Sequence, residues 1–519
     1  MSLNPIINAD FPDPDIVRVG DTFYMISTTM FFMPGGDILR SYDLAHWEIV
    51  GHIFADLGEG DRYELANGEN VYSRGMWAPS IRYHDGLFYV TFACNEKRKS
   101  LLYTAKDPLG EWELTELDDF YHDASLFFDD DGRVYIVSGN TTININELDP
   151  KTWKKKEGGL SKVLIEDKKG QFLGYEGCHL YKYNGEYYLF TCHMPKETDG
   201  RKTEDCFISD SLEGSFRGKL ILNDCMGYRP YLQVAQGGMV DDAYGNLYMF
   251  MFQDRGAIGR APVIMPMRFD DDGYPMPDTP DGKVPISFEG CKYDPAVNDR
   301  IRDLIYADDD FEYKDVDDML ASSPWWQISH NPDKGCISFT DRHSIKIKTN
   351  RTVPNLLHAR NVFTVRCMGP VSSASINIDV SGLNEGDYAG IAVYNAHYGS
   401  LAVRKHDGKN ELVLVNADAA NPGVGGDKGF FDRDPEEIVI DTLDTNVITL
   451  IANADFSKEP DVSYFEYVKA GEKKKAGGEH PVYFKLDMFT GCRFALFVYS
   501  KKQPGGCAEF SEYRMTVAE

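Results

Sequence analysis

The sequence has little of what several common functions require. Its 54 Lys and Arg residues are outnumbered by 82 Asp and Glu residues, which gives a formal net charge of −28. Nucleic acids and anionic membrane surfaces are bound through basic patches, so this acidic excess argues against both as partners. The 10 cysteines are scattered and include no Cys-x-x-Cys pair. The sequence therefore predicts neither a zinc site nor a dense disulfide framework.

Long apolar runs and long runs of helix-forming residues are also scarce. No apolar run approaches 18 residues, so no membrane-spanning helix is predicted. The first five residues lead directly into a strand without the apolar core of a signal peptide, and we therefore expect a cytoplasmic protein. With 42% hydrophobic residues, 13% aromatic residues and 47 glycines, the 519-residue chain is expected to form two to four mainly β domains.

What is present begins with an acid held between two prolines, in the stretch Asn8-Ala9-Asp10-Phe11-Pro12-Asp13-Pro14-Asp15. The prolines fix their own φ angles and favour extended geometry in the residues before them. The orientation of the Asp13 side chain is therefore expected to be restricted before packing begins, which suits a catalytic group. Taken alone, the stretch favours an ordinary Pro-Asp-Pro turn, because a motif needs its context.

The context is a pattern that occurs five times: a head residue, an apolar strand, a turn and an aromatic second strand. From head to tyrosine the spacing is eleven residues in the first unit and twelve in the other four. Turn dipeptides such as Asp85-Gly86 and Asn184-Gly185 are strong hairpin signals. Heads that lie 46 to 64 residues apart fit the blades of a five-bladed β-propeller better than a β-sandwich with accidental similarity. The five heads are Asp13, Trp77, Asp123, Glu176 and Gln236.

Equivalent heads converge around the axis of a propeller, so Asp13, Asp123 and Glu176 are predicted to meet in one pocket. Two carboxyl groups that flank a glycosidic bond suffice to hydrolyse it, one as proton donor and the other acting on water or on carbon. A third carboxylate nearby raises the pKa of the acid. The acidic runs at 129–131 and 270–272 precede Gly and are expected to be solvated turns, so no metal ligands are predicted.

The propeller pattern ends near residue 300, after a segment rich in Pro, Asp and Gly, and alternating strands follow. We predict an all-β chain with a catalytic five-bladed propeller over residues 1–300. A β-sandwich accessory domain of jelly-roll type is predicted over residues 301–519. This second domain either buttresses the propeller or lends a loop that narrows the pocket, and the sequence favours neither.

Short stretches throughout the chain carry a family resemblance. In the propeller they are residues 4–6, 12–14, 41–47, 76–79, 122–127, 175–181 and 259–260. In the second domain they are residues 326–332, 357–361 and 387–391. The propeller resembles the glycosidases of glycoside hydrolase family 43, the β-xylosidases and α-L-arabinofuranosidases. The second domain is similar to the concanavalin-like β-sandwich that follows the propeller in one branch of that family.

The resemblance implies roles for the matching residues. Asp13 would be the general base that activates water, Glu176 the general acid, and Asp123 the group that orients the acid and tunes its pKa. Arg260 would contact sugar hydroxyls, and apolar walls would enclose the −1 subsite. The substrate-binding residues implied in this way are Phe32, Trp77, Gln236 and Arg260.

The implied activity is that of an exo-acting, inverting, metal-independent glycosidase that releases terminal pentose from arabinoxylan or xylo-oligosaccharides. Gln236 stands where much of the family has His beside a central calcium or water, so a calcium is not expected at the axis and no cofactor is required. Residues 31–35 read Phe-Phe-Met-Pro-Gly where the xylosidase branch typically reads Glu-Trp-Phe-Pro-Gly. The choice between xylose and arabinofuranose therefore stays open, with α-L-arabinofuranosidase placed slightly ahead. The alternative is a carbohydrate-binding propeller without catalysis.

Overall fold

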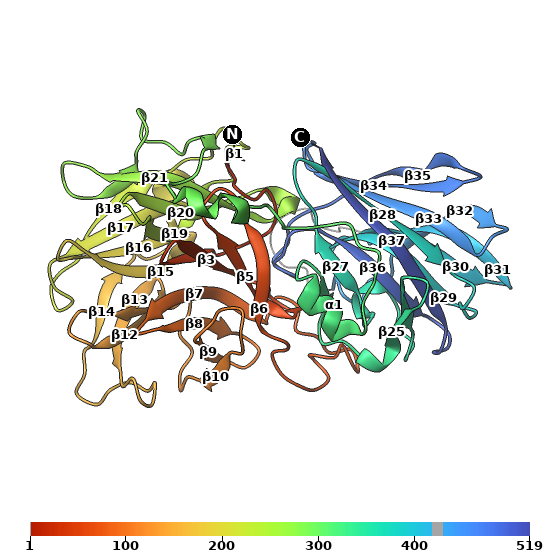
Figure 1. Ribbon diagram of the computed structural model, residues 1–519, viewed down its shortest axis with the longest axis horizontal. Coiled ribbons are helices and arrows are strands. Elements are labelled where there is room, and N and C mark those ends of the chain that lie inside the picture. The colour runs from red at the N-terminus through yellow and green to blue at the C-terminus, as the bar shows by residue number, and fades with distance from the viewer. Residues whose placement is uncertain (1, 418–428, 519) are drawn as a thin grey trace.

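The computed structural model describes residues 2–417 and 429–518, and both halves of the chain are built from antiparallel strands (Figure 1). The first half consists of five four-stranded sheets arranged as a propeller, which confirms the predicted fold. The blades are β2 (Asp15–Val19), β3 (Thr22–Ser27), β5 (Gly35–Ser41) and β6 (Glu48–Phe54); β7 (Met76–His84), β8 (Leu87–Cys94), β9 (Lys99–Ala105) and β10 (Glu113–Glu116); β11 (Ser125–Phe128), β12 (Val134–Asn140), β13 (Thr142–Leu148) and β14 (Ser161–Glu166); β15 (Leu173–Tyr183), β16 (Glu186–Met194), β17 (Thr203–Ser209) and β18 (Arg217–Leu222); and β19 (Val234–Asp241), β20 (Leu247–Asp254), β21 (Arg260–Phe269) and β22 (Pro275–Pro277).

The N-terminal segment ties the ring to its last blade. β1 (Ser2–Leu3) pairs with β23 (Ser287–Phe288), which follows the fifth blade. The Asn4 side-chain amide donates to the carbonyl of Ile264 in β21 at 2.8 Å, and the backbone N–H of Ile6 donates to Pro262 at 3.0 Å. The opening stretch is thereby fixed before it reaches Asp13.

Each inner strand has a residue in the left-handed conformation, either just before it or at a β-bulge near its start, and these residues correct the predicted heads. They are Asp13 (φ 52°), Ala78 (27°), Asp123 (44°), Gly177 (67°) and Gln236 (60°). Trp77 and Glu176 therefore lie one position before the residues that are equivalent to Asp13. The φ of Asp13 also shows that the extended geometry expected before Pro14 was wrong.

Turn length explains the shifted heads. In blades 1, 2 and 4 two residues separate the first strand from the second, as in the pairing of His84 with Leu87. In blades 3 and 5 the turn has three residues, because Asp129 N–H bonds to the carbonyl of Arg133 and Asp242 N–H to that of Asn246. The extra residue lengthens the spacing to the tyrosine by one in these two blades. A uniform spacing of twelve therefore placed two heads, Trp77 and Glu176, one residue too early.

The second half contains a two-layer sandwich, as predicted, with one sheet that also includes a propeller strand. One sheet has eight strands in the order β32-β31-β30-β29-β36-β27-β24-β4, and the other has seven in the order β25-β26-β37-β28-β33-β34-β35. Their bounds are β4 (Phe32–Met33), β24 (Gln327–Ser329), β25 (Ile337–Thr340), β26 (Ser344–Lys348), β27 (Phe363–Arg366), β28 (Val371–Asp379), β29 (Asp387–Tyr394), β30 (Gly399–His406), β31 (Lys409–Asn416), β32 (Glu436–Leu443), β33 (Val447–Asp455), β34 (Val462–Lys469), β35 (Glu472–Pro481), β36 (Arg493–Ser500) and β37 (Cys507–Ala518).

The two halves share a core. β4 comes from the first blade and pairs with β24, so the eight-stranded sheet ends on a propeller strand. Every residue of β29 and of β36 is buried, since the sheet is covered on one face by the other sheet and on the other face by blades 1 and 2. Figure 1 shows the sandwich packed along one side of the propeller. This packing brings second-domain loops to the propeller surface.

Helices are short in the part of the chain that the structure describes. α1 (Val316–Ser322) is accompanied by the 3₁₀ turns η1 (Lys196–Thr198), η2 (Gly256–Ile258), η3 (Pro295–Arg300), η4 (Lys334–Cys336) and η5 (Leu356–His358). Across residues 2–417 and 429–518, no helix has the length and apolar character needed to cross a membrane. The domain boundary at residue 300 stays a prediction.

Candidate active site

The structure brings the three predicted carboxylates together at the heads of blades 1, 3 and 4. His122 Nε2 lies 3.3 Å from Glu176 Oε2 and 3.6 Å from Asp123 Oδ1. The negative charge of Asp13 raises the pKa of both His122 and Asp123, so it is close enough to act on them. The backbone N–H of Cys178 donates to the carbonyl of Asp123 at 3.3 Å and joins blade 4 to blade 3. The repeat thus predicted this convergence correctly, although Glu176 is not at the equivalent position.

Four hydrogen bonds fix the Asp13 carboxylate. Thr28 Oγ1 donates to Oδ2 at 2.7 Å, and Gln236 Nε2 donates to Oδ1 at 3.2 Å. Arg260 Nη1 donates to both oxygens, at 2.9 and 3.2 Å. The side chain is 7% exposed. A charged acceptor held in this way by an arginine and neutral donors keeps one orientation, which meets the geometric requirement for a base.

Glu176 is held at one oxygen and is more exposed than Asp13. Asn140 Nδ2 donates to its Oε2 at 2.6 Å, and His122 Nε2 lies near the same oxygen. The Glu176 side chain is 17% exposed, compared with 7% for Asp123. Because donors occupy Oε2, a proton on this carboxyl is expected on Oε1, where it is available to a ligand.

Asp123 and His122 have strongly shifted pKa values. Burial raises the pKa of Asp123 to about 7, and the charges of Glu176 and Asp13 act in the same direction while His122 opposes them. Burial lowers the pKa of His122, but the carboxylates of Asp123, Glu176 and Asp13 outweigh it and raise the value to about 9. A cationic imidazole therefore sits between two carboxyl groups at neutral pH, and one of these titrates near pH 7.

The Asp123 pKa predicts a pH-dependent gain in stability when the group is removed. The pKa of Asp123 in the folded protein, about 7, exceeds the ordinary 3.8, so ionisation of this group opposes folding. The free energy of unfolding therefore falls between about pH 4 and pH 7 and does not fall further above pH 7. Asp123→Asn is expected to raise Tm at pH 8 by about 2–4 °C more than at pH 5. Differential scanning calorimetry at both pH values measures this. An equal or smaller gain at pH 8 would contradict the assigned burial and charge repulsion.

A loop of the second domain reaches the site, and its role in narrowing the pocket stays a prediction. The ring of Phe489 lies 5.8 Å from that of Trp77 and 4.5 Å from Cζ of Arg260, measured to its centroid. Arg260 Nη2 also approaches the carbonyl of Phe489 at 3.4 Å. Trp77 in turn lies edge-on to His122, with centroids 6.1 Å apart. The second domain thus supplies part of the wall beside the carboxylates.

The other predicted substrate-binding residues have structural partners. Gln236 is buried and binds Asp13 through its amide, while its backbone N–H donates to Glu204 Oε2 at 2.6 Å. Phe32 is 1% exposed, and the Cζ of Arg493 lies 3.6 Å from its ring centroid, in the junction between the halves. The roles of Phe32 and Gln236 toward a sugar stay predictions, as does the contact of Arg260 with sugar hydroxyls.

Near the inner strands, Asp15 forms a buried ion pair. Arg82 Nη1 lies 2.5 Å from Asp15 Oδ2, and His179 Nδ1 lies 3.5 Å from Asp15 Oδ1. Burial lowers the pKa of His179 to about 4. The Asp15 carboxylate is thus paired with a fixed cation, and the expectation that no calcium lies at the axis stays a prediction. His122, Asp123 and Glu176 offer ligand atoms within 4.8 Å of one another.

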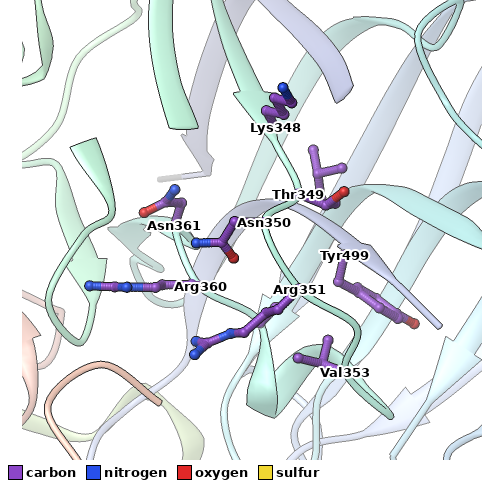
Figure 2. Close-up of a pocket in the computed structure, with 10 residues that line it drawn as sticks. Lys348, Thr349, Asn350, Arg351, Val353, Arg360, Asn361 and Tyr499 are labelled. Atoms are coloured by element: carbon purple, nitrogen blue, oxygen red, sulfur yellow. The ribbon is translucent and has the colours of Figure 1, made fainter. Parts of the chain in front are cut away.

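Two hollows lie elsewhere on the molecule. A cavity of about 10 Å³ in the second domain is lined by Arg351 and Arg360, whose side chains point to the same side in Figure 2. Both bind Glu64 of the propeller, through its carbonyl and its carboxylate respectively, so the cavity belongs to the domain junction. A cleft of about 850 Å³ lies between β6, residues 108–114 and α1. Neither hollow is lined by the three carboxylates.

Sequence reasoning missed several residues that shape the site. They are Thr28, Asn140 and Phe489. Asn140 ends β12 and Thr28 follows β3, so both occupy strand ends at the carboxylate end of the ring. Their positions at strand ends that face the heads could have identified Asn140 and Thr28. No feature of the sequence could have identified Phe489, which lies more than 200 residues beyond the last blade.

Comparisons with known proteins agree with this arrangement. The family model described as glycosyl hydrolases family 43 matches residues 2–275, and the model of the beta xylosidase C-terminal concanavalin A-like domain matches residues 314–516. A "Xylosidase/arabinosidase" of Butyrivibrio fibrisolvens is 33% identical over 298 residues, 53% of this chain and 56% of that protein. A "Beta-xylosidase" of Formosa agariphila is 25% identical over 97% of this chain and 88% of its own length.

Among solved structures, a "Bifunctional GH43-CE" protein of Bacteroides eggerthii has a TM-score of 0.87 and 34% identity, over 99% of this chain and 63% of that one. The chain thus spans just over half of the length of the Butyrivibrio protein and less than two thirds of the length of the Bacteroides protein.

Proposed function

The chain belongs to glycosyl hydrolase family 43 and is a glycoside hydrolase, and from this premise we propose that it removes terminal pentose units from arabinoxylan or xylo-oligosaccharides by an inverting mechanism. The meeting of Asp13, Asp123 and Glu176 from three blades carries the proposal. The names of the relatives, a xylosidase/arabinosidase and a beta-xylosidase, support a pentose. We place α-L-arabinofuranose ahead of β-D-xylose, because residues 31–35 depart from the xylosidase pattern.

In the proposed reaction Asp13 accepts a proton from water while the water oxygen attacks the anomeric carbon. The bond between that carbon and the leaving oxygen breaks, and Glu176 transfers the proton of its Oε1 to the leaving oxygen. Asn140 holds Oε2 and so directs the proton outward. The carboxyl group of Asp123 and the imidazole of His122 supply the charged groups next to Glu176. Attack from the face opposite the leaving group inverts the configuration. No metal takes part in this proposal.

The wall that the second domain supplies supports exo action. Phe489 packs against both Trp77 and Arg260. A wall on this side favours entry of a chain end over passage of a chain through the site.

Side-by-side hydrolysis of 4-nitrophenyl α-L-arabinofuranoside and 4-nitrophenyl β-D-xyloside tests the proposal. We expect release from the arabinofuranoside to exceed release from the xyloside, and branched arabinoxylan to yield free arabinose without shortening of its backbone. Proton NMR of the first product is expected to show the inverted anomer. Absence of release from both substrates, with binding retained, would favour the carbohydrate-binding alternative.

A further inference from the structure

The carboxylate of Asp10 lies where three distant segments of the chain meet. It is 3% exposed. Its Oδ1 accepts the backbone N–H of Arg260 at 2.9 Å, and its Oδ2 accepts the backbone N–H of Gly491 at 2.7 Å. One carboxylate therefore joins the start of β21 in the propeller to the second-domain loop that carries Phe489.

The packing around this carboxylate is tight on every side. A Cβ on Gly491 would lie 1.9 Å from the carbonyl oxygen of Ile258, and one on Gly259 would lie 2.2 Å from Asp10 Oδ1. The carbonyl of Asp10 accepts Arg366 Nε of β27 at 2.6 Å. Because the backbone at Gly259 and Gly491 is in close contact with its neighbours, a displacement of the Asp10 side chain is expected to shift the backbone of both Arg260 and Gly491.

Each partner leads to a group of the site. The side chain of Arg260 holds both oxygens of Asp13. Phe489, two residues before Gly491, packs on the same guanidinium and on Trp77. A shift of the loop relative to β21 would therefore move the apolar wall and Arg260 against each other.

We propose that Asp10 is a positioning residue that sets the second-domain loop 484–491 in register with Arg260, and so couples the sandwich to the carboxylate site. Asp10 does not touch the reacting atoms. It acts through the two backbone N–H groups that it accepts. The activity part of this inference rests on the proposed function, whereas the placement of the loop does not.

Asp10→Asn tests the proposal because the amide keeps one acceptor and turns a donor toward the other N–H. Hydrogen–deuterium exchange is expected to rise in peptides covering 484–491 and to stay unchanged in β36. Where the wild type hydrolyses an aryl pentoside, kcat/KM is expected to fall about 10- to 100-fold. Adding Phe489→Ala should cause much less further loss than Phe489→Ala causes alone, since residues that act through one contact are not additive.

The matched control is Asp309→Asn. Asp309 is 4% exposed and accepts a backbone N–H from Phe311 at 2.7 Å within the sandwich. It should lower stability without changing loop exchange or kcat/KM. Asp10→Ser replaces Asp10→Asn if the latter does not fold. Unchanged loop exchange, or fully additive losses with Phe489→Ala, would overturn the proposal. A wild type inactive on pentosides, with raised loop exchange in Asp10→Asn, would instead reject the proposed function alone.

Discussion

Asp13→Asn is expected to lower kcat for the favoured aryl pentoside by about 10²–10⁴-fold, with little change in KM. Asparagine occupies the same volume but cannot accept the proton of the attacking water. Binding should persist, because Trp77, Phe489 and the Arg260 guanidinium remain in place. A loss in kcat at constant KM marks an interaction that is made only in the transition state. Steady-state kinetics with the 4-nitrophenyl pentosides measures both parameters.

Asp129→Asn is the matched control for this experiment. Asp129 is also a buried acid with a cationic partner, since Lys182 Nζ lies 2.7 Å from its Oδ1. It follows β11, at the end of the strand opposite to Asp123. This control should keep kcat within about twofold of wild type while losing some stability. If Asp13→Asn keeps more than about a tenth of the wild-type kcat, Asp13 is not the base.

Periodic features explain why so much of the propeller could be predicted. Blades repeat, so an eleven-residue path from Asp13 to Tyr24 served as a template for the other four units. The same regularity caused the error of one residue at Trp77 and Glu176, because a two-residue and a three-residue turn look alike without the pairing. The error did not hide the convergence, since neighbouring positions at the head of a strand face the same end of the ring.

The contribution of the second domain could not be predicted for a different reason. Phe489 and Gly491 reach the site through packing of a sandwich against blades 1 and 2, and no local pattern encodes that contact. Asp10 illustrates the limit well. It lies three residues before Asp13, inside the most informative stretch of the sequence, yet its partners are 250 and 481 residues away. Long-range partners of this kind require the fold.

Glu176→Gln is expected to show a loss that depends on the leaving group. With xylobiose or an arabinosylated xylo-oligosaccharide, kcat should fall about 10²–10⁴-fold, because an alkoxide leaves poorly without a proton. With a 2,4-dinitrophenyl pentoside the loss should stay below about tenfold, since that phenolate needs no general acid. The amide should keep the bond from Asn140 through its carbonyl oxygen, so the site geometry is preserved.

The dependence on the leaving group separates an acid from a base at this site. Asp13→Asn should lower kcat equally for both classes of substrate, because water must be activated whichever group departs. Glu147→Gln serves as the control for Glu176→Gln. Glu147 is a buried glutamate paired with Lys156 on blade 3, and its replacement should change neither rate. Equal losses on both classes for Glu176→Gln would exclude proton donation to the leaving oxygen. If the two variants showed the reverse pattern, the assignment of base and acid would be exchanged between blades 1 and 4.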